Sequence, residues 1–422
     1  MKKTILFYEC KKALTAPIIL ALLLLFSAYN IFNIYSSSSF KEELHVANQL
    51  ASKYGSHITS ESLSTLEIDI KEELYVLNEM TEKKSGQTYE SAFDFFSELS
   101  YEDEQRYADN ELLFMHELYL KEMYAETAKA IKPSYEKINI EKIAESEIVR
   151  YKLEGQAAVT LRNQFAKFAE RFADLQSNGE HTQWFFSGKQ YYMHSLLFKD
   201  VFRGLVIELI ILVVLATALV VNYEFENRTQ LVTYSAKRGR RLLGDKLVAS
   251  LIVTMTVMTI LLFLTLGSYF IVYDYSHLFK SSISSAFNWE GNFPNVSWWS
   301  MSFMTYLLVG IALMYIALLL ISMITFVIAV FVKNSYYTFL LFGGVFIILY
   351  LLQGFMPASS NLLYITGFNL STLLLNPQTW FLGSKGLLLF KYYELITVSA
   401  WTIILVMLCT LCLRTFKNQS IV

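Results

Sequence analysis

Three short patterns in this chain of 422 residues have the spacing of catalytic or metal-binding motifs, and the first has the spacing of a phosphate-binding loop. Gly239 and Gly244 stand as far apart as the first and last glycines of that loop, but Asp245 occupies the position of its lysine. A carboxylate at this position would repel a phosphate, and the segment does not follow a buried strand. The pattern therefore does not predict a nucleotide site.

The other two patterns have the spacing of metal sites and are also incomplete. His116 and Glu117 begin an HExxH motif, but Leu120 stands where the second zinc ligand is needed. Cys409 and Cys412 have CxxC spacing in an apolar stretch without a second pair, which favours buried small hydrophobic residues over a redox or metal centre. No serine elbow or paired acid site stands out. We therefore expect a protein that is not an enzyme and binds no cofactor or metal itself.

Long apolar segments must position the remaining polar residues. Hydrophobic residues make up 54% of the chain and aromatic residues 15%, with only five prolines, which is outside the range of an ordinary soluble domain. A helix needs roughly 20 apolar residues to cross a bilayer. We expect an all-α membrane protein with six transmembrane helices, at residues 17–35, 201–221, 247–272, 303–332, 336–352 and 395–413.

Basic residues are concentrated on one side of these spans. The short loops of the opposite side carry only Lys280, Lys385 and Lys391. By the positive-inside rule we expect a multi-pass protein of the plasma membrane with both termini in the cytoplasm. The first span is too long for a signal peptide and no clear cleavage site precedes Ser36, so we expect an uncleaved anchor. The basic residues of the expected inner side are Lys2, Lys3, Lys11, Lys12, Arg228, Lys237, Arg238, Arg240, Arg241, Lys246, Lys333, Arg414 and Lys417.

A hydrophilic block at residues 36–198 separates the first two spans. It holds 17 Lys and Arg against 28 Asp and Glu, a net charge of −11, and we expect it to be extracytoplasmic. Apolar residues recur at spacings of three and four, which predicts a bundle of about four or five helices. Among prolines only Pro133 interrupts the block, and a few glycines make natural breaks between helices. The periodic residues are Leu63, Leu66, Ile70, Leu74, Leu77, Phe165, Phe168, Phe172 and Leu175, and the glycines are Gly55, Gly86, Gly155 and Gly179.

The charged connection at residues 223–246 carries the most information about function. It begins with Glu224-Phe225-Glu226-Asn227-Arg228-Thr229, continues through Leu231 to Lys237-Arg238, and ends with Leu242-Leu243-Gly244-Asp245-Lys246. In order and spacing it resembles the loop after the second span of ABC-2 type transporter permeases. That loop begins with ExExGT, has an apolar turn and a basic residue, and approaches a lysine through leucines. This chain departs from the pattern because Arg228 replaces the usual glycine and no proline precedes the basic cluster.

The resemblance implies a topology that covers all six spans. The family has an amphipathic cytoplasmic start and a re-entrant helical hairpin before the last span, and residues 1–12 and 355–393 match these parts. We expect the hairpin arms at residues 362–375 and 380–390, broken by Asn376-Pro377 and Gly383. The expected organisation is an amphipathic start and first span at 1–35, a helical extracytoplasmic domain at 36–198, and five spans at 199–422 with the cytoplasmic loop at 222–246. The outer domain is an insertion that only some subfamilies resemble.

The resemblance also implies partners. A separate ATP-binding cassette ATPase would bind ATP and Mg, and a second permease copy or a homologous permease would complete a pair in membrane lipid, with no nucleic acid. The substrate would be an exported or extracted amphipathic peptide, lipid or drug-like molecule; the acidic outer domain favours a cationic peptide, as in resistance to antimicrobial peptides. Alternatively, the basic residues of the loop only fix topology and contact headgroups. The implied ATPase-coupling residues are Glu224, Glu226, Arg228, Thr229, Lys237 and Arg238.

Glu208 is the most unusual residue inside a span. A carboxylate in an apolar helix is costly and usually faces a cavity, a partner or a path, so we assign Glu208 to the substrate path. A pair with Arg203 is disfavoured because a spacing of five places the two on different helix faces. The alternative functions are a membrane sensor or accessory protein with an outer ligand-binding domain, and a channel or membrane enzyme. A sensor would need a larger cytoplasmic domain, and a channel would need a polar stripe.

Overall fold

Six long apolar helices form the framework of the computed structural model, which describes residues 2–186, 195–236, 239–290, 293–383 and 386–418. Each is long and apolar enough to cross a membrane, which indicates a multi-pass membrane protein and confirms the six expected segments. The six helices are α2 (Pro17–Ser36), α10 (Phe202–Glu226), α12 (Leu242–Val272), α13 (Phe303–Val332), α14 (Ser335–Leu352) and α17 (Tyr393–Asn418). Polar and charged residues continue three of these helices beyond the expected limits: α10 and α17 end five residues later, and α12 begins five residues earlier.

Helix α10 lies at the centre of this bundle. In its most apolar stretch 72% of the residues are buried inside the protein, against 22% for α2 and α17 and 11% for α14. It packs against α12, α13 and α14, and a π-helical turn at Ser195–Val201 leads into it. The peripheral helices instead expose large side chains such as Ile348 and Ile403. Such faces suit contact with lipid or with another membrane helix.

The block between the first two spans is helical, as its periodicity predicted. Gly55, Gly86 and Gly179 follow the ends of three of its helices with positive φ, a conformation that glycine adopts without steric cost, so these breaks are confirmed. Pro133 does not interrupt the helical structure as expected, because it lies in the last turn of a helix that continues to Glu136. The helices are α3 (Lys41–Tyr54), α4 (Ser60–Ser85), α5 (Ala92–Glu98), α6 (Tyr101–Glu104), α7 (Asp109–Glu136), α8 (Ile140–Arg150) and α9 (Gly155–Asn178), after a 3-10 turn at Ser38–Phe40.

Irregular segments cover the ends of the spans. The connection from α12 to α13 contains one short antiparallel pair, β1 (Trp289–Glu290) with β2 (Phe293–Pro294). Before α17 the chain forms only short helices, so the expected re-entrant hairpin stays a prediction. They are η4 (Gln353–Phe355), α15 (Leu362–Ile365), α16 (Leu370–Leu375), η5 (Pro377–Thr379) and η6 (Gly386–Leu388).

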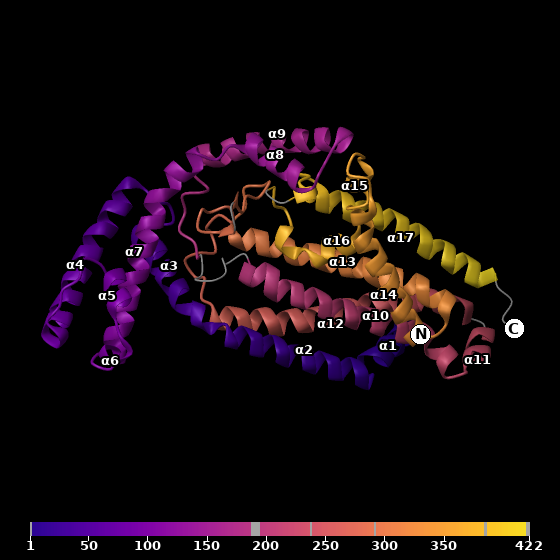
Figure 1. Cartoon of the computed structure of the whole chain (residues 1–422). Helices are drawn as coiled ribbons and strands as arrows, with labels where there is room; N and C mark the ends of the chain where they lie inside the picture. Colours follow the sequence, from indigo (N-terminus) through magenta and orange to yellow (C-terminus); the bar gives the residue numbers. More distant parts are fainter. Residues whose placement is uncertain (1, 187–194, 237–238, 291–292, 384–385, 419–422) are drawn as a thin grey trace.

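The two ends of the molecule differ in character. Helices α4 to α7 project at one end, whereas both chain termini and the short helix α11 (Gln230–Ser235) lie at the other (Figure 1). Helix α1 (Lys2–Leu14) packs against α12 and α10 at the same end as α11, before the turn at Thr15 and Ala16 that leads into α2. The charged connection between α10 and α12 is thus next to the first helix of the chain.

Candidate functional site

Four charged side chains form a buried cluster where α1, α10 and α12 meet. The Lys12 ammonium lies 2.6 Å from Glu9 Oε1 and 2.7 Å from Glu224 Oε1. Lys246 pairs with the other oxygen of Glu224 and lies 3.6 Å from Glu9 Oε2. Two carboxylates and two ammonium groups thus balance each other in charge while joining three helices.

Burial makes this cluster costly to break. Lys246 is fully buried, and Glu9 and Glu224 are 4% and 3% exposed. The Lys246 ammonium also donates hydrogen bonds to the backbone oxygens of Val220 and Val221 in the last turns of α10. Burial alone would lower the pKa of Lys12, but its hydrogen bonds to Glu224 and Glu9 outweigh this and raise that pKa above its ordinary value. A buried charge of this kind is tolerated only when it is paired.

Helix α11 carries exposed apolar residues next to the cluster. Leu231 and Val232 are 56% and 79% exposed, whereas Tyr234 is 2% exposed. The Tyr234 ring packs 5.7 Å from the Phe225 ring of α10 and 5.1 Å from the Phe416 ring of α17, measured between centroids. One side of this short helix is therefore fastened to two spans, and the other presents apolar side chains at the surface.

The residues between α10 and α11 form a tight turn. Glu226 is exposed, and its Oε1 accepts a hydrogen bond of 2.6 Å from the backbone nitrogen of Ser335, at the start of α14. Arg228 has a φ of +55°, in the left-handed region that favours glycine, so the residue that replaces the usual glycine still adopts a glycine-like backbone. The Thr229 backbone nitrogen donates to the oxygen of Glu224 at 2.9 Å and closes the end of α10.

Glu208 lies in the middle of three spans. Its side chain is 5% exposed, and its Oε2 accepts a hydrogen bond of 2.7 Å from Asn30 Nδ2 of α2. The same Asn30 nitrogen lies 3.2 Å from Thr265 Oγ1 of α12. The structure therefore places Glu224 in the charge cluster of α1, α10 and α12 and Glu226 beside α14, and it places Glu208 in a separate site. Lys237 and Arg238 lie outside the described residues.

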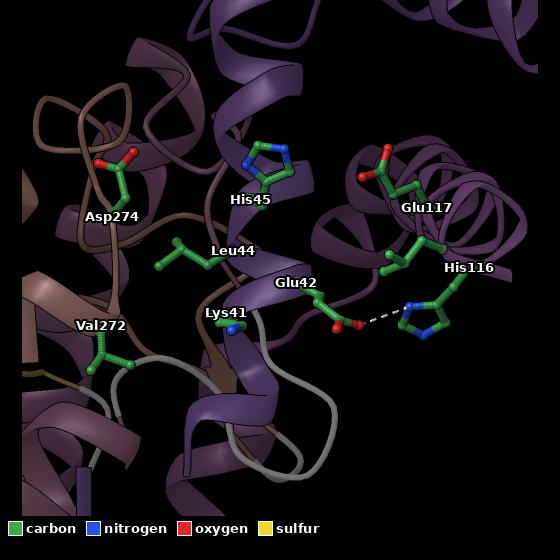
Figure 2. A pocket seen from close by; sticks show the side chains of 9 residues that line it. Lys41, Glu42, Leu44, His45, His116, Glu117, Val272 and Asp274 are labelled. Carbon is green, nitrogen blue, oxygen red and sulfur yellow. Dashed lines mark ion pairs between the residues drawn. The ribbon is translucent and has the colours of Figure 1, made fainter. Parts of the chain in front are cut away.

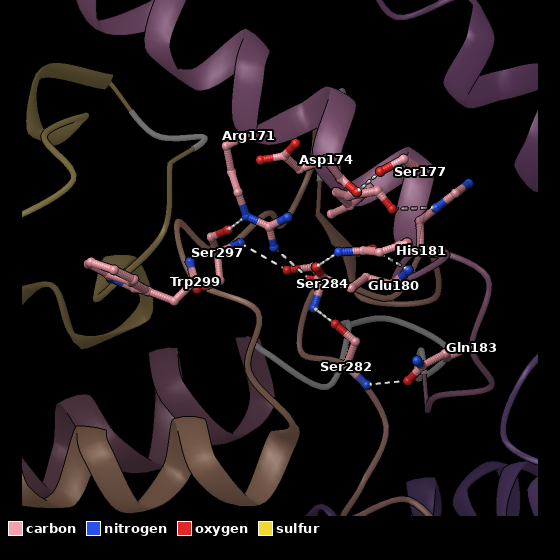
Figure 3. A network of polar contacts seen from close by, with 12 residues as sticks. Arg171, Asp174, Ser177, Glu180, His181, Gln183, Ser282, Ser284, Ser297 and Trp299 are labelled. Atoms are coloured by element: carbon pink, nitrogen blue, oxygen red, sulfur yellow. Dashed lines mark hydrogen bonds and ion pairs between the residues drawn. The ribbon is translucent and has the colours of Figure 1, made fainter.

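The helical block between the first two spans is tied to the connection between α12 and α13 by a buried polar junction. Arg171 of α9 lies 2.6 Å from Glu180 and donates through Nε to the Ser297 backbone oxygen at 3.0 Å (Figure 3). Gln183 Oε1 accepts from the Ser282 backbone nitrogen at 2.7 Å. The backbone nitrogen of Ala286 also donates to the oxygen of His181 at 3.0 Å. Movement of α9 is thereby linked to the segment that joins two spans.

A cavity of about 490 Å³ lies between α3, α7 and the end of α12. His116 points toward Glu42, and its Nδ1 lies 3.2 Å from Glu42 Oε2 (Figure 2). His45, Glu117 and Asp274 also line this cavity. Within the described ranges, no group of three or more His, Cys, Asp or Glu side chains is arranged to hold a metal ion.

No family model, curated protein or solved structure matches this chain. The function must therefore be inferred from the arrangement of the residues themselves. The charge cluster of α1, α10 and α12 is the part that sequence reasoning missed, because it treated Glu224 as a residue for a partner and Lys12 as a topological charge. The available signal was a lysine at the start of α12 and an acid at the end of α10, which is a complementary pair across one short connection.

The junction of Figure 3 contains a histidine whose titration should loosen it. Burial lowers the pKa of His181, although the Leu175 backbone oxygen and the Glu180 charge act in the opposite direction. A group with a lowered pKa stabilises the fold fully above its ordinary value of about 6.5 and loses that contribution as the pH falls below it. We expect hydrogen exchange at residues 179–186 to accelerate from pH 7.5 to pH 5.5, after correction for intrinsic exchange rates. His181→Gln should show less pH dependence, and an unchanged pH profile in this variant would contradict the assignment.

Proposed function

We propose that this chain is the permease subunit of an ABC-2 type transporter. The observation that carries the proposal is helix α11, which presents Leu231 and Val232 at the surface next to a buried charge cluster that joins α1, α10 and α12. An ATP-binding cassette ATPase, with its own ATP and Mg, would dock on this helix from the cytoplasm. The resemblance of the connection to the family's loop adds support.

The contacts around α11 suit the transmission of force. Tyr234 connects α11 to α10 and α17 through its ring contacts. The ion pairs of Lys246 connect the start of α12 to α10 and α1. A displacement of α11 would therefore move several spans together instead of bending one loop. Glu226, Arg228 and Thr229 shape the turn and are exposed enough to meet a partner, whereas Glu224 serves the internal cluster.

The lateral faces of the bundle suit assembly in a membrane. Helices α2, α14 and α17 expose most of their apolar residues, which a second permease copy or lipid would cover. The acidic outer domain would receive or release an amphipathic substrate on the far side, and cationic molecules would be attracted to its net charge of −11 over residues 36–198.

Replacing Val232 by aspartate tests the docking role of α11. We expect the variant to remain folded, because this side chain is 79% exposed, and to lose co-elution with its candidate ATPase and stimulation of ATP turnover. Burying an unpaired carboxylate in an apolar interface costs several kcal/mol, so binding should weaken by at least about tenfold. The matched control is Val149→Asp on α8, where the side chain is 75% exposed at a site that the proposal leaves free. A folded Val232→Asp chain that retains wild-type co-elution would remove the docking role from α11.

A further inference from the structure

A cavity of about 270 Å³ lies between α2, the start of α10 and the end of α12, on the side of the bundle away from α11. Polar and aromatic side chains line it, among them Asn30, Asn33, Tyr269 and Tyr273. Asp200 adds an acidic group to this lining. The volume is just below the range of sites for a whole small ligand, so the cavity suits one chemical group of a larger molecule.

The positions along the three helices show that this cavity leads toward Glu208. On α10, Gly204 lines the wall and Glu208 follows it by four residues, hence on the same face one turn deeper. A Cβ built at Gly204 meets no atom within 4 Å, so the missing side chain leaves open space there. On α12, Tyr269 lines the wall and Thr265 lies one turn deeper in the same way. Asn30 belongs to the wall and contacts both of these deeper residues.

One turn deeper than the wall lies the carboxyl group of Glu208, which pairs with no basic side chain of the described chain. Glu208 is 5% exposed, and among the described residues its carboxylate accepts a hydrogen bond from the Asn30 amide alone. Arg203 and Lys199, the nearest basic residues along the chain, do not line the cavity. Asn30 uses its nitrogen toward Glu208 and Thr265, and its amide oxygen accepts no hydrogen bond from the described residues. The amide oxygen of Asn30 therefore offers an acceptor at the wall of the cavity, and the carboxyl group of Glu208 lies one turn deeper.

We propose that this cavity binds the ammonium group of an amphipathic amine. An N–H of the ammonium donates to Asn30 Oδ1, and the Glu208 carboxylate behind it supplies the opposite charge. The tyrosine rings of the lining add a favourable environment for a cation. The apolar body of the ligand extends toward the exposed faces of the spans. The role of the site in transport rests on the proposed function, whereas binding requires only this chain.

A matched pair of small probes tests the proposal on the full-length chain in lipid nanodiscs, without any ATPase. We expect saturable binding of 2-phenylethylamine by titration calorimetry, above the signal of empty nanodiscs. The uncharged analogue 2-phenylethanol has a similar shape and should bind at least about tenfold more weakly. Equal affinity for the two probes, or no saturable binding of the amine to the folded chain, would overturn the proposal. Because no ATPase is present, a failure of α11 docking cannot produce either result.

Two variants locate the binding. Glu208→Gln keeps an acceptor for Asn30 but removes the charge, so amine affinity should fall at least about tenfold while 2-phenylethanol is unaffected. Gly204→Leu keeps Glu208 and fills the cavity, so it should abolish binding of both probes. Glu72→Gln, an exposed carboxamide substitution on α4, should bind as the wild type does. Wild-type amine affinity in a folded Glu208→Gln or Gly204→Leu chain would show that the amine binds elsewhere.

Discussion

Replacing Lys246 by methionine should lower the free energy of unfolding by about 3–5 kcal/mol, because it leaves one unbalanced negative charge between two buried carboxylates. Glu9 and Glu224 would then share Lys12 as the single ammonium group of the cluster. Methionine keeps the length of the lysine stem, so packing changes little. The measurement is the thermal midpoint of the purified chain in detergent, followed by gel filtration.

The double variant Lys246→Met with Glu224→Gln separates the effect of charge from that of packing. It leaves Glu9 and Lys12, which are 2.6 Å apart, as a neutral pair, so most of the lost stability should return. The control is Lys71→Met on the exposed face of α4, which should shift the midpoint little. If Lys246→Met melts with the wild type, the four residues do not stabilise the joint between the helices.

Replacing Arg171 by methionine should open the junction between the helical block of residues 36–198 and the connection from α12 to α13. The Arg171 side chain is 10% exposed and the Glu180 side chain 7%. The substitution removes the donor to Glu180 Oε2 and the donor to the Ser297 backbone oxygen, and leaves only Asn178 donating to Glu180 Oε1 among the described residues. Breaking a buried pair of this kind costs about 3–5 kcal/mol. We expect hydrogen exchange at residues 179–186 and 281–290 to accelerate at least about 100-fold, which corresponds to about 2.7 kcal/mol.

An exposed pair of the same chemistry is the natural comparison. Arg162 and Glu145 lie 2.6 Å apart, with side chains 50% and 54% exposed. Such pairs contribute about 0–1 kcal/mol, so Arg162→Met should leave exchange at both segments near the wild-type rate. Equal effects of the two substitutions would mean that burial gives the Arg171 pair no special part in holding the junction.

The spans and the main helix faces follow from local patterns. Phe165, Phe168, Phe172 and Leu175 recur at helical spacing, and all four are buried in α9. Apolar periodicity of this kind reports which face must be removed from water, and that requirement does not depend on distant residues. Cys409 and Cys412 are buried as well, in agreement with their interpretation as small hydrophobic residues.

The polar sites depend on contacts that no local pattern encodes. Asn30 meets Glu208 across 178 positions of the chain, and Lys12 meets Glu224 across 212. Their pairing depends on which helices pack together, so the sequence predicted that Glu208 was special but not that Asn30 was its partner. The partner of Glu224 was equally hard to predict, because an acid at the end of a span can pair with a basic residue of a neighbouring helix or with one of another protein.

The four charges that join α1, α10 and α12 are also synthesised in a fixed order. Glu9 and Lys12 pair within α1, so they can neutralise each other as soon as that helix forms. Glu224 is made next, and Lys246 follows it 22 residues later, which takes on the order of 1 to 4 seconds at ordinary translation rates. During that interval Lys12 is the one ammonium group of this cluster that can pair with Glu224. Lys12 of α1 can therefore pair with Glu224 of α10 until α12, which carries Lys246, has been inserted.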